Sequence, residues 1–75
     1  MQELIEYIAK SLASKPDEVK VTTTQEEDRV VLKLQVADED KGKIIGRQGR
    51  VAQAMRTLLR VAAVKDGTKA ILEIV

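Results

Sequence analysis

The stretch GKIIGRQGR, residues 42–50, contains three of the four glycines in this 75-residue chain, interspersed with basic side chains. Gly46 is placed to end a helix, because glycine adopts the positive φ that stops a helix at little cost. Gly49 then starts the next helix without a capping side chain, so the first backbone N–H groups of that helix point out of the turn. These amides, the helix dipole and the adjacent cations predict a seat for a phosphate group. An ordinary glycine-rich connection between two helices is the alternative.

Positive charge surrounds this turn and is segregated from the acidic residues. The segment from residue 41 to residue 65 holds seven basic side chains and no acidic one, although the formal net charge of the chain is only +1. A surface without a charged partner would interleave the two signs, so the segregation indicates an anionic ligand. The seven are Lys41, Lys43, Arg47, Arg50, Arg56, Arg60 and Lys65.

Hydrophobic periodicity predicts an α+β fold with the element order αββααβ. Apolar residues at three-to-four spacing indicate helices, and apolar–polar alternation indicates strands. The expected helices cover residues 2–14, 39–45 and 50–65, and the expected strands cover residues 18–24, 29–36 and 69–75. A polar loop at residues 25–28 has the length of a hairpin connection between the first two strands.

The same pattern predicts which side chains are buried. In the second strand, Val31 is expected to face outward, because it alternates with an inward-facing set. That inward set is Val30, Leu32, Leu34 and Val36. The expected buried face of the long helix comprises Val51, Met55, Leu58, Leu59 and Ala62.

An acidic triplet, Asp38-Glu39-Asp40, precedes the short helix. Asp38 is predicted to be its N-cap, with Glu39 and Asp40 in a first turn that favours negative charge. A carboxylate metal site is the less favoured alternative.

The composition disfavours catalysis. The chain has no histidine and no cysteine, which removes the usual general base, the thiol nucleophile and the usual zinc ligands. We expect no catalytic residue, no metal ion and no cofactor. The longest apolar runs are three residues, too short for a membrane span or a signal peptide. The absence of cysteine fits a reducing compartment, so the expected location is the cytoplasm.

Three other anion-binding or nucleic-acid-binding designs do not match. The glycine spacing is wrong for a mononucleotide P-loop, and no Ser or Thr follows to bind magnesium. The long helix leaves few polar side chains for reading DNA bases, as a helix-turn-helix protein would require. Tyr7 is the single aromatic residue, so base-stacking platforms are also excluded.

The run Ile44-Ile45-Gly46-Arg47-Gln48-Gly49 resembles the (I/V)-I-G-x-x-G signature of KH RNA-binding domains, whose GxxG loop clamps the backbone of about four nucleotides. The order αββααβ is similar to the type II form. The segments ELIEYIAKSL and GKIIGRQGRVAQAMRTLL extend the resemblance to the small bacterial single-domain KH proteins of the KhpA family. The resemblance implies one KH domain over residues 1–75, with a three-stranded mixed sheet covered on one face by three helices.

The resemblance also implies a site. The GxxG loop would be residues 46–49, and the variable loop would be residues 24–28. The residues expected to bind RNA are Lys43, Ile44, Ile45, Gly46, Arg47, Gln48, Gly49, Arg50, Val51 and Arg56. One of Ile44 and Ile45 would face the groove and the other the core. Ala52 departs from the family pattern, in which a large aliphatic residue is common, so Val51 and Met55 are expected to form the groove wall instead.

Partners follow from the resemblance as well. The expected ligand is single-stranded RNA, with a role as a post-transcriptional regulator or RNA chaperone linked to cell elongation and division. A lone groove without stacking predicts weak binding, so avidity from a homodimer or from a second KH protein of the KhpB (Jag, EloR) type is expected. The alternative is a protein-interaction module that acts through KH–KH pairing, with RNA binding secondary. No membrane partner is expected.

Overall fold

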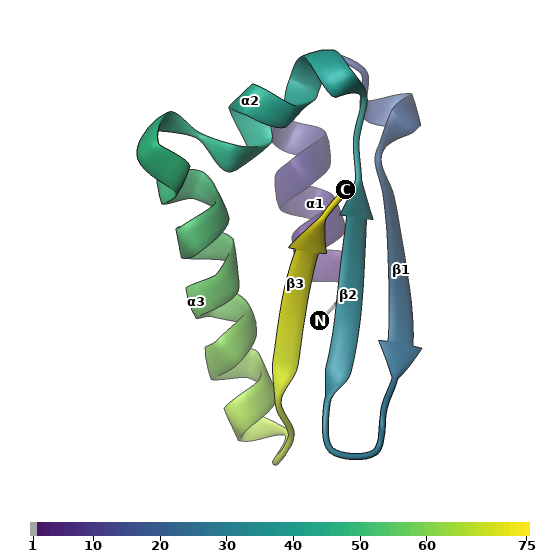
Figure 1. Ribbon diagram of the computed structural model, residues 1–75, viewed down its shortest axis with the longest axis vertical. Helices are drawn as coiled ribbons and strands as arrows, with labels where there is room; N and C mark the ends of the chain where they lie inside the picture. The colour runs from purple at the N-terminus through teal and green to yellow at the C-terminus, as the bar shows by residue number, and fades with distance from the viewer. Residues whose placement is uncertain (1) are drawn as a thin grey trace.

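The computed structural model describes residues 2–75 and confirms the α+β class and the order αββααβ (Figure 1). The elements are α1 (Gln2–Leu12), β1 (Lys20–Gln25), β2 (Val30–Gln35), α2 (Lys41–Ile45), α3 (Arg50–Lys65) and β3 (Ala70–Ile74). Short 3₁₀ turns precede β1, α2 and α3, at Pro16–Glu18, Asp38–Asp40 and Arg47–Gly49. The bounds of α3 match the predicted helix residue for residue.

The sheet is mixed and has β2 at its centre. Strand β1 pairs antiparallel to β2, and β3 pairs parallel to it on the other side. In this register Leu32 lies opposite Thr23 of β1 and Leu72 of β3. The return from β2 to a parallel β3 requires a long crossover, and that crossover is the α2–α3 unit that carries the glycine turn (Figure 1).

One face of the sheet is covered and forms the core. Figure 1 shows α1 behind the sheet and α3 alongside β3. Alternating side chains of β2 point toward the helices, as predicted, because successive residues of a strand face opposite sides. The buried cluster comprises Ile5, Ala9, Val19, Val30, Leu32, Leu34, Val36, Ile44, Met55, Leu59 and Leu72.

Two boundaries near the N-terminus differ from the prediction. Helix α1 ends at Leu12 rather than at residue 14, and β1 begins at Lys20 rather than at residue 18. Pro16 starts a 3₁₀ turn in which the Glu18 N–H donates to the Lys15 carbonyl at 3.0 Å. That turn occupies the residues that alternation alone assigns to the strand.

The long helix is rotated relative to the predicted buried face. Met55 and Leu59 are buried as expected, but Ala52 and Ala63 complete the stripe. Leu58 is 47% exposed, whereas Leu59 is 1% exposed, so the prediction for Leu58 was wrong. Adjacent helical residues project about 100° apart, and only one of two neighbouring leucines fits a narrow core-facing stripe. Val51 and Ala62 are half-buried at its margins.

Val31 is a second correction. It lies on the sheet face that carries no helix, yet it is buried. As a residue of the central strand, it is flanked by Thr24 of β1 and Ile71 of β3 in register. These neighbours on the same face exclude water from Val31, an effect that alternation along one strand does not report.

Candidate nucleic-acid interface

The glycine turn has an unusual backbone. Gly46, Gln48 and Gly49 all have positive φ, at 79°, 57° and 73°. The Gly46 N–H closes α2 on the Gly42 carbonyl at 2.9 Å, and the Gly49 N–H donates to the Gly46 carbonyl at 3.1 Å. The chain therefore reverses within residues 46–49 and leaves Arg47 and Gln48 exposed at the tip.

The two glycines are required for different reasons. Gly46 combines a φ of 79° with a ψ of 173°, a region that only glycine occupies readily. A β-carbon there would also lie 2.4 Å from Val51 Cγ2. Gly49 is left-handed, but a β-carbon at that position would meet nothing within 4 Å. The expectation that Gly49 makes room for a helix start was therefore wrong, and backbone conformation is the reason for this glycine.

Helix α3 begins without a side-chain cap. Its N-cap is Gly49, and no side chain there accepts from the first turn, which confirms the uncapped start that the sequence predicts. The positive end of a 16-residue helix therefore lies directly behind the exposed turn, with Arg50 as its first residue. Backbone donors and the dipole together favour an anion at this place.

The paired isoleucines separate between core and surface. Ile44 is fully buried in the core, whereas Ile45 is 40% exposed. Ile44 therefore supports the turn from beneath rather than offering a contact surface. Val51 is half-buried against Gly46. Met55 is buried and cannot form an open groove wall, so that part of the expectation for Val51 and Met55 was wrong.

A buried carboxylate holds α2 against the end of α1. Asp40 is 0% exposed, and its two oxygens accept the backbone N–H groups of Ser14 and Lys15, each at 3.0 Å. These two hydrogen bonds, with a further contribution from Lys43, hold the pKa of Asp40 below its usual value. Lys43 donates to Ser14 Oγ at the same junction. Asp40 thus fixes the helix that leads into the glycine turn, a role that sequence reasoning missed.

The acidic triplet does not act as predicted. Asp38 makes no N-cap hydrogen bond and instead pairs with Lys41 at 3.0 Å. Glu39 pairs with Lys15 at 2.6 Å. Because Asp40 is directed at α1, the three carboxylates have separate partners. Within residues 2–75 no group of three or more His, Cys, Asp or Glu side chains is arranged to hold a metal ion.

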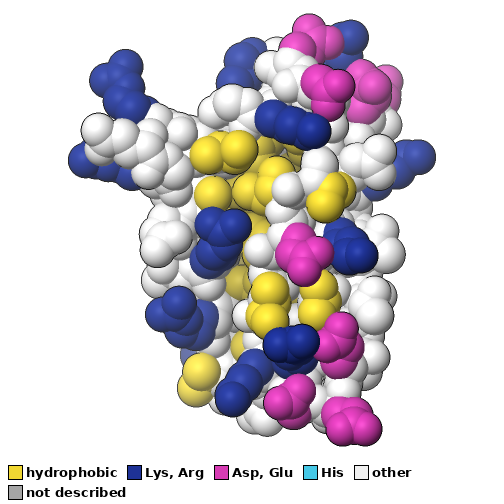
Figure 2. Space-filling model, viewed as in Figure 1, with side chains coloured by type: hydrophobic (Ala, Val, Ile, Leu, Met, Phe, Trp, Pro, Cys, Tyr) yellow, Lys and Arg dark blue, Asp and Glu magenta, His cyan; other side chains and the backbone are white. Residues whose placement is uncertain are grey.

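Most cations of the basic segment remain unpaired. Five of the seven form no ion pair within the described residues, namely Arg47, Arg50, Arg56, Arg60 and Lys65. Figure 2 shows Lys and Arg side chains along the α3 side of this face, whereas Asp and Glu gather toward the β1 side. The free positive charge therefore follows α3 from the glycine turn downward.

An apolar depression lies between α3 and the sheet. In Figure 2 hydrophobic side chains fill the strip between these two parts of the surface. A cavity of about 210 Å³ opens there, with Arg56 on its rim and Leu59 and Leu72 in its lining. Of the expected contact residues, only Arg56 lines this cavity. The others lie at the turn or, for Lys43 and Ile44, point to the α1 junction and the core.

A mixed sheet in the order αββααβ, with a glycine turn between the two crossover helices, is a type II-like KH fold. The family model described as "KhpA/KhpB, KH domain" matches residues 2–74. A protein named RNA-binding protein KhpA from Clostridium perfringens is 48% identical over the full length of both chains. Its namesake from Clostridium acetobutylicum is 49% identical, also over both full lengths. The namesake from Borreliella burgdorferi is 51% identical over 96% of this chain and 88% of its own.

The chain belongs to the KhpA/KhpB family of KH domains. This family is non-enzymatic, in agreement with the lack of catalytic residues expected from the sequence. No solved structure is significantly similar to the chain. None of the helices within residues 2–75 is long and apolar enough to span a bilayer.

Proposed function

We propose that this chain binds single-stranded RNA, without catalysis, in the groove between the GxxG turn with α3 and the sheet. The observation that carries the proposal is the turn itself. Positive φ at Gly46 and Gly49 exposes an uncapped helix start beside Arg47, with no carboxylate in the basic segment to compete. The relatives' name, RNA-binding protein, supports the choice of ligand.

In this proposal the turn binds phosphates and the groove receives bases. Arg47 and Gln48 contact the RNA backbone together with the first amides of α3. Arg50 and Arg56 add positive charge along the helix, and Ile45 supplies exposed apolar surface near the turn. Since no aromatic side chain is available for stacking, one domain binds weakly, and a second domain raises the apparent affinity.

The cellular role that we propose is post-transcriptional control or RNA chaperoning in the cytoplasm, linked to cell elongation and division. It rests on the family resemblance. Partner KH domains, either a second copy or a KhpB-type protein, would supply the avidity that a single groove lacks.

The test is a salt titration of RNA binding with Arg47→Asp and Gln48→Asp combined. Both side chains are exposed, so the fold should survive the change. Lost phosphate contacts must weaken binding and flatten the salt dependence, by about 0.7 in slope per contact for a single strand. The matched control combines Lys20→Asp and Gln25→Asp on β1, the strand on the opposite edge of the sheet from β3. Equal affinity and slope for the turn variant and the unaltered protein would refute the proposal.

A protein-interaction module is the second candidate, and one observation favours it. Leu58 and Val61 on α3 are large, apolar and exposed, at 47% and 52%. A second KH domain docking there would bury them. Changing both to Lys should then convert a dimer to a monomer in sedimentation while single-site RNA affinity is kept. An unchanged association state in the double variant would count against this candidate.

A further inference from the structure

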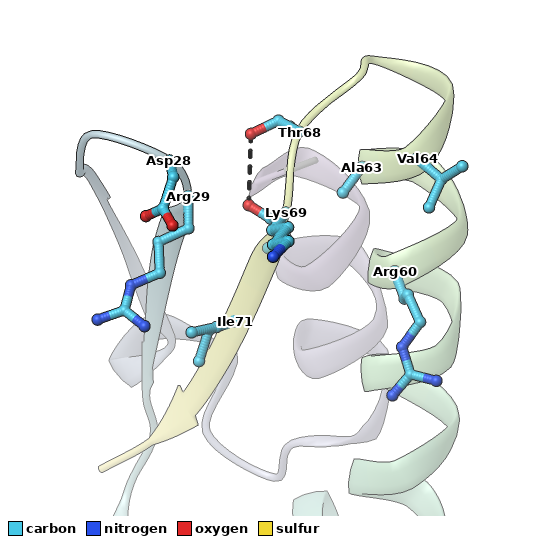
Figure 3. A pocket seen from close by; sticks show the side chains of 9 residues that line it. Asp28, Arg29, Arg60, Ala63, Val64, Thr68, Lys69 and Ile71 are labelled. Carbon is cyan, nitrogen blue, oxygen red and sulfur yellow. Dashed lines mark hydrogen bonds between the residues drawn. The ribbon is translucent and has the colours of Figure 1, made fainter.

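The largest cavity of the molecule lies at the end of the groove remote from the GxxG turn (Figure 3). Its volume is about 460 Å³, and it is bounded by the last turns of α3, the start of β3 and the β1–β2 hairpin loop. The lining residues are Asp28, Arg29, Arg60, Ala63, Val64, Thr68, Lys69, Ala70 and Ile71. None of the residues expected to bind RNA is among them.

The cavity pairs an apolar floor with a cationic rim. Ala63 and Val64 of α3 face Ile71 of β3 across it. Arg60 and Lys69 stand on the rim, and neither forms an ion pair within residues 2–75. This combination suits a ligand that has a flat apolar part and a negative charge, which is the chemistry of a nucleotide.

The other two charged lining residues are less available to an anion. Arg29 is held by Glu26 at 2.8 Å. Asp28 lies on the hairpin side and repels phosphate. Phosphates are therefore directed to the Arg60 and Lys69 side, while the Asp28 carboxylate is able to accept from amino groups on a base.

The cavity is continuous with the groove beside the turn. It shares Arg60, Ala70 and Ile71 with the smaller cavity, which extends toward Arg56. Arg60 is ten residues beyond the start of α3 at Arg50, about 15 Å along the helix axis at 1.5 Å per residue. A single strand that leaves the turn along α3 passes Arg56 and then reaches Arg60.

We propose that this cavity binds a further nucleotide of the same RNA strand, beyond the nucleotides clamped at the GxxG turn. The inference rests on the proposed function and extends its footprint. Arg60 and Lys69 bind phosphate, and the base packs on Ala63, Val64 and Ile71. Arg60, which charge alone marks only as part of a general positive field, becomes a specific contact.

The experiment compares two lengths of single-stranded RNA, one of about four nucleotides, the length a GxxG loop clamps, and one of about eight. The variant combines Arg60→Gln with Lys69→Gln, and the matched control combines Lys65→Gln with Lys20→Gln, two exposed lysines outside both cavities. We expect the variant to bind the longer RNA at least fivefold more weakly. Its salt slope should flatten by about 1.4, since two contacts are lost at about 0.7 each. Binding of the shorter RNA should match the control.

The outcomes separate this inference from the proposed function. An equal loss for both lengths, or a slope like that of the control, would overturn the extended footprint and leave binding at the turn intact. If the unaltered protein binds neither RNA, the proposed function fails and the inference fails with it.

A proximity measurement gives a second test. The chain has no cysteine, so Val64→Cys introduces a unique thiol at the cavity. Attached to a photoreactive group, it should crosslink to the longer RNA and not to the shorter one. Leu58→Cys, exposed on α3 outside the cavity, is the matched control. Equal crosslinking at both positions would contradict the inference.

Discussion

The side chain of Val51 lies directly over the α-carbon of Gly46, so closely that an added β-carbon would be 2.4 Å from Val51 Cγ2. This contact joins the first turn of α3 to the last residue of α2. It sets how the two helices meet and therefore the shape of the turn between them. The turn is thus held by packing as well as by the backbone conformation of its glycines.

Gly46→Ala should strongly destabilise the protein. Alanine combines an unfavourable backbone region with overlap against Val51, and together these should cost about 3 kcal/mol of unfolding free energy. Urea denaturation followed by circular dichroism measures the difference. Gly42→Ala is the matched control, because a β-carbon there meets nothing within 4 Å inside α2. That change should stabilise the protein by up to about 1 kcal/mol. Similar stabilities for the two variants would show that the contact does not constrain the turn.

Asp40→Asn should lower stability at neutral pH, because an amide group cannot accept both the Ser14 and Lys15 N–H bonds. The folded-state pKa of Asp40 lies below its unfolded value of about 3.9. The carboxylate therefore stabilises the fold above that pH, and the contribution is lost as the pH falls through the folded pKa. The gap between variant and unaltered protein should accordingly narrow in acid.

Denaturation midpoints measured from neutral pH down to acid test this expectation. Asp38→Asn is the control, since the side chain of Asp38 is almost fully exposed and its partner is a surface lysine. A gap that stays constant as the solution is acidified would contradict the role given to the Asp40 carboxylate.

The rotation of α3 is tested by two adjacent leucines. Leu59→Ala should cost about 2–5 kcal/mol, because it opens a cavity in the core. Leu58→Ala should change the unfolding free energy of the monomer by no more than about 0.5 kcal/mol, because its side chain is already exposed. The two variants measured under the same denaturant conditions suffice. Reversed or equal effects would mean that α3 is rotated differently.

Local signals in the sequence predict most of the architecture. The 3.6-residue period and the Asp66-Gly67 turn define α3, and alternation defines β2. Glycine spacing likewise locates the turn at residues 46–49. Each of these features depends on neighbours in the chain, which is why one sequence is enough to find it.

Features that depend on distant residues could not be predicted. Asp40 resembles a helix cap until α1 brings Ser14 and Lys15 to it. Val31 is buried only because both neighbouring strands flank it. The cavity at Arg60 needs α3, β3 and the hairpin together, so the sequence marks its cations only as part of a basic segment.

The most direct test of RNA binding at the GxxG turn is a nitrogen-15 NMR titration of the unaltered protein with single-stranded RNA. The account predicts that the largest shifts occur in the amides of residues 46–51, with smaller shifts along the α3 face toward Arg60. A pattern confined to α1 or to β1, with the amides of residues 46–51 unmoved, would contradict it.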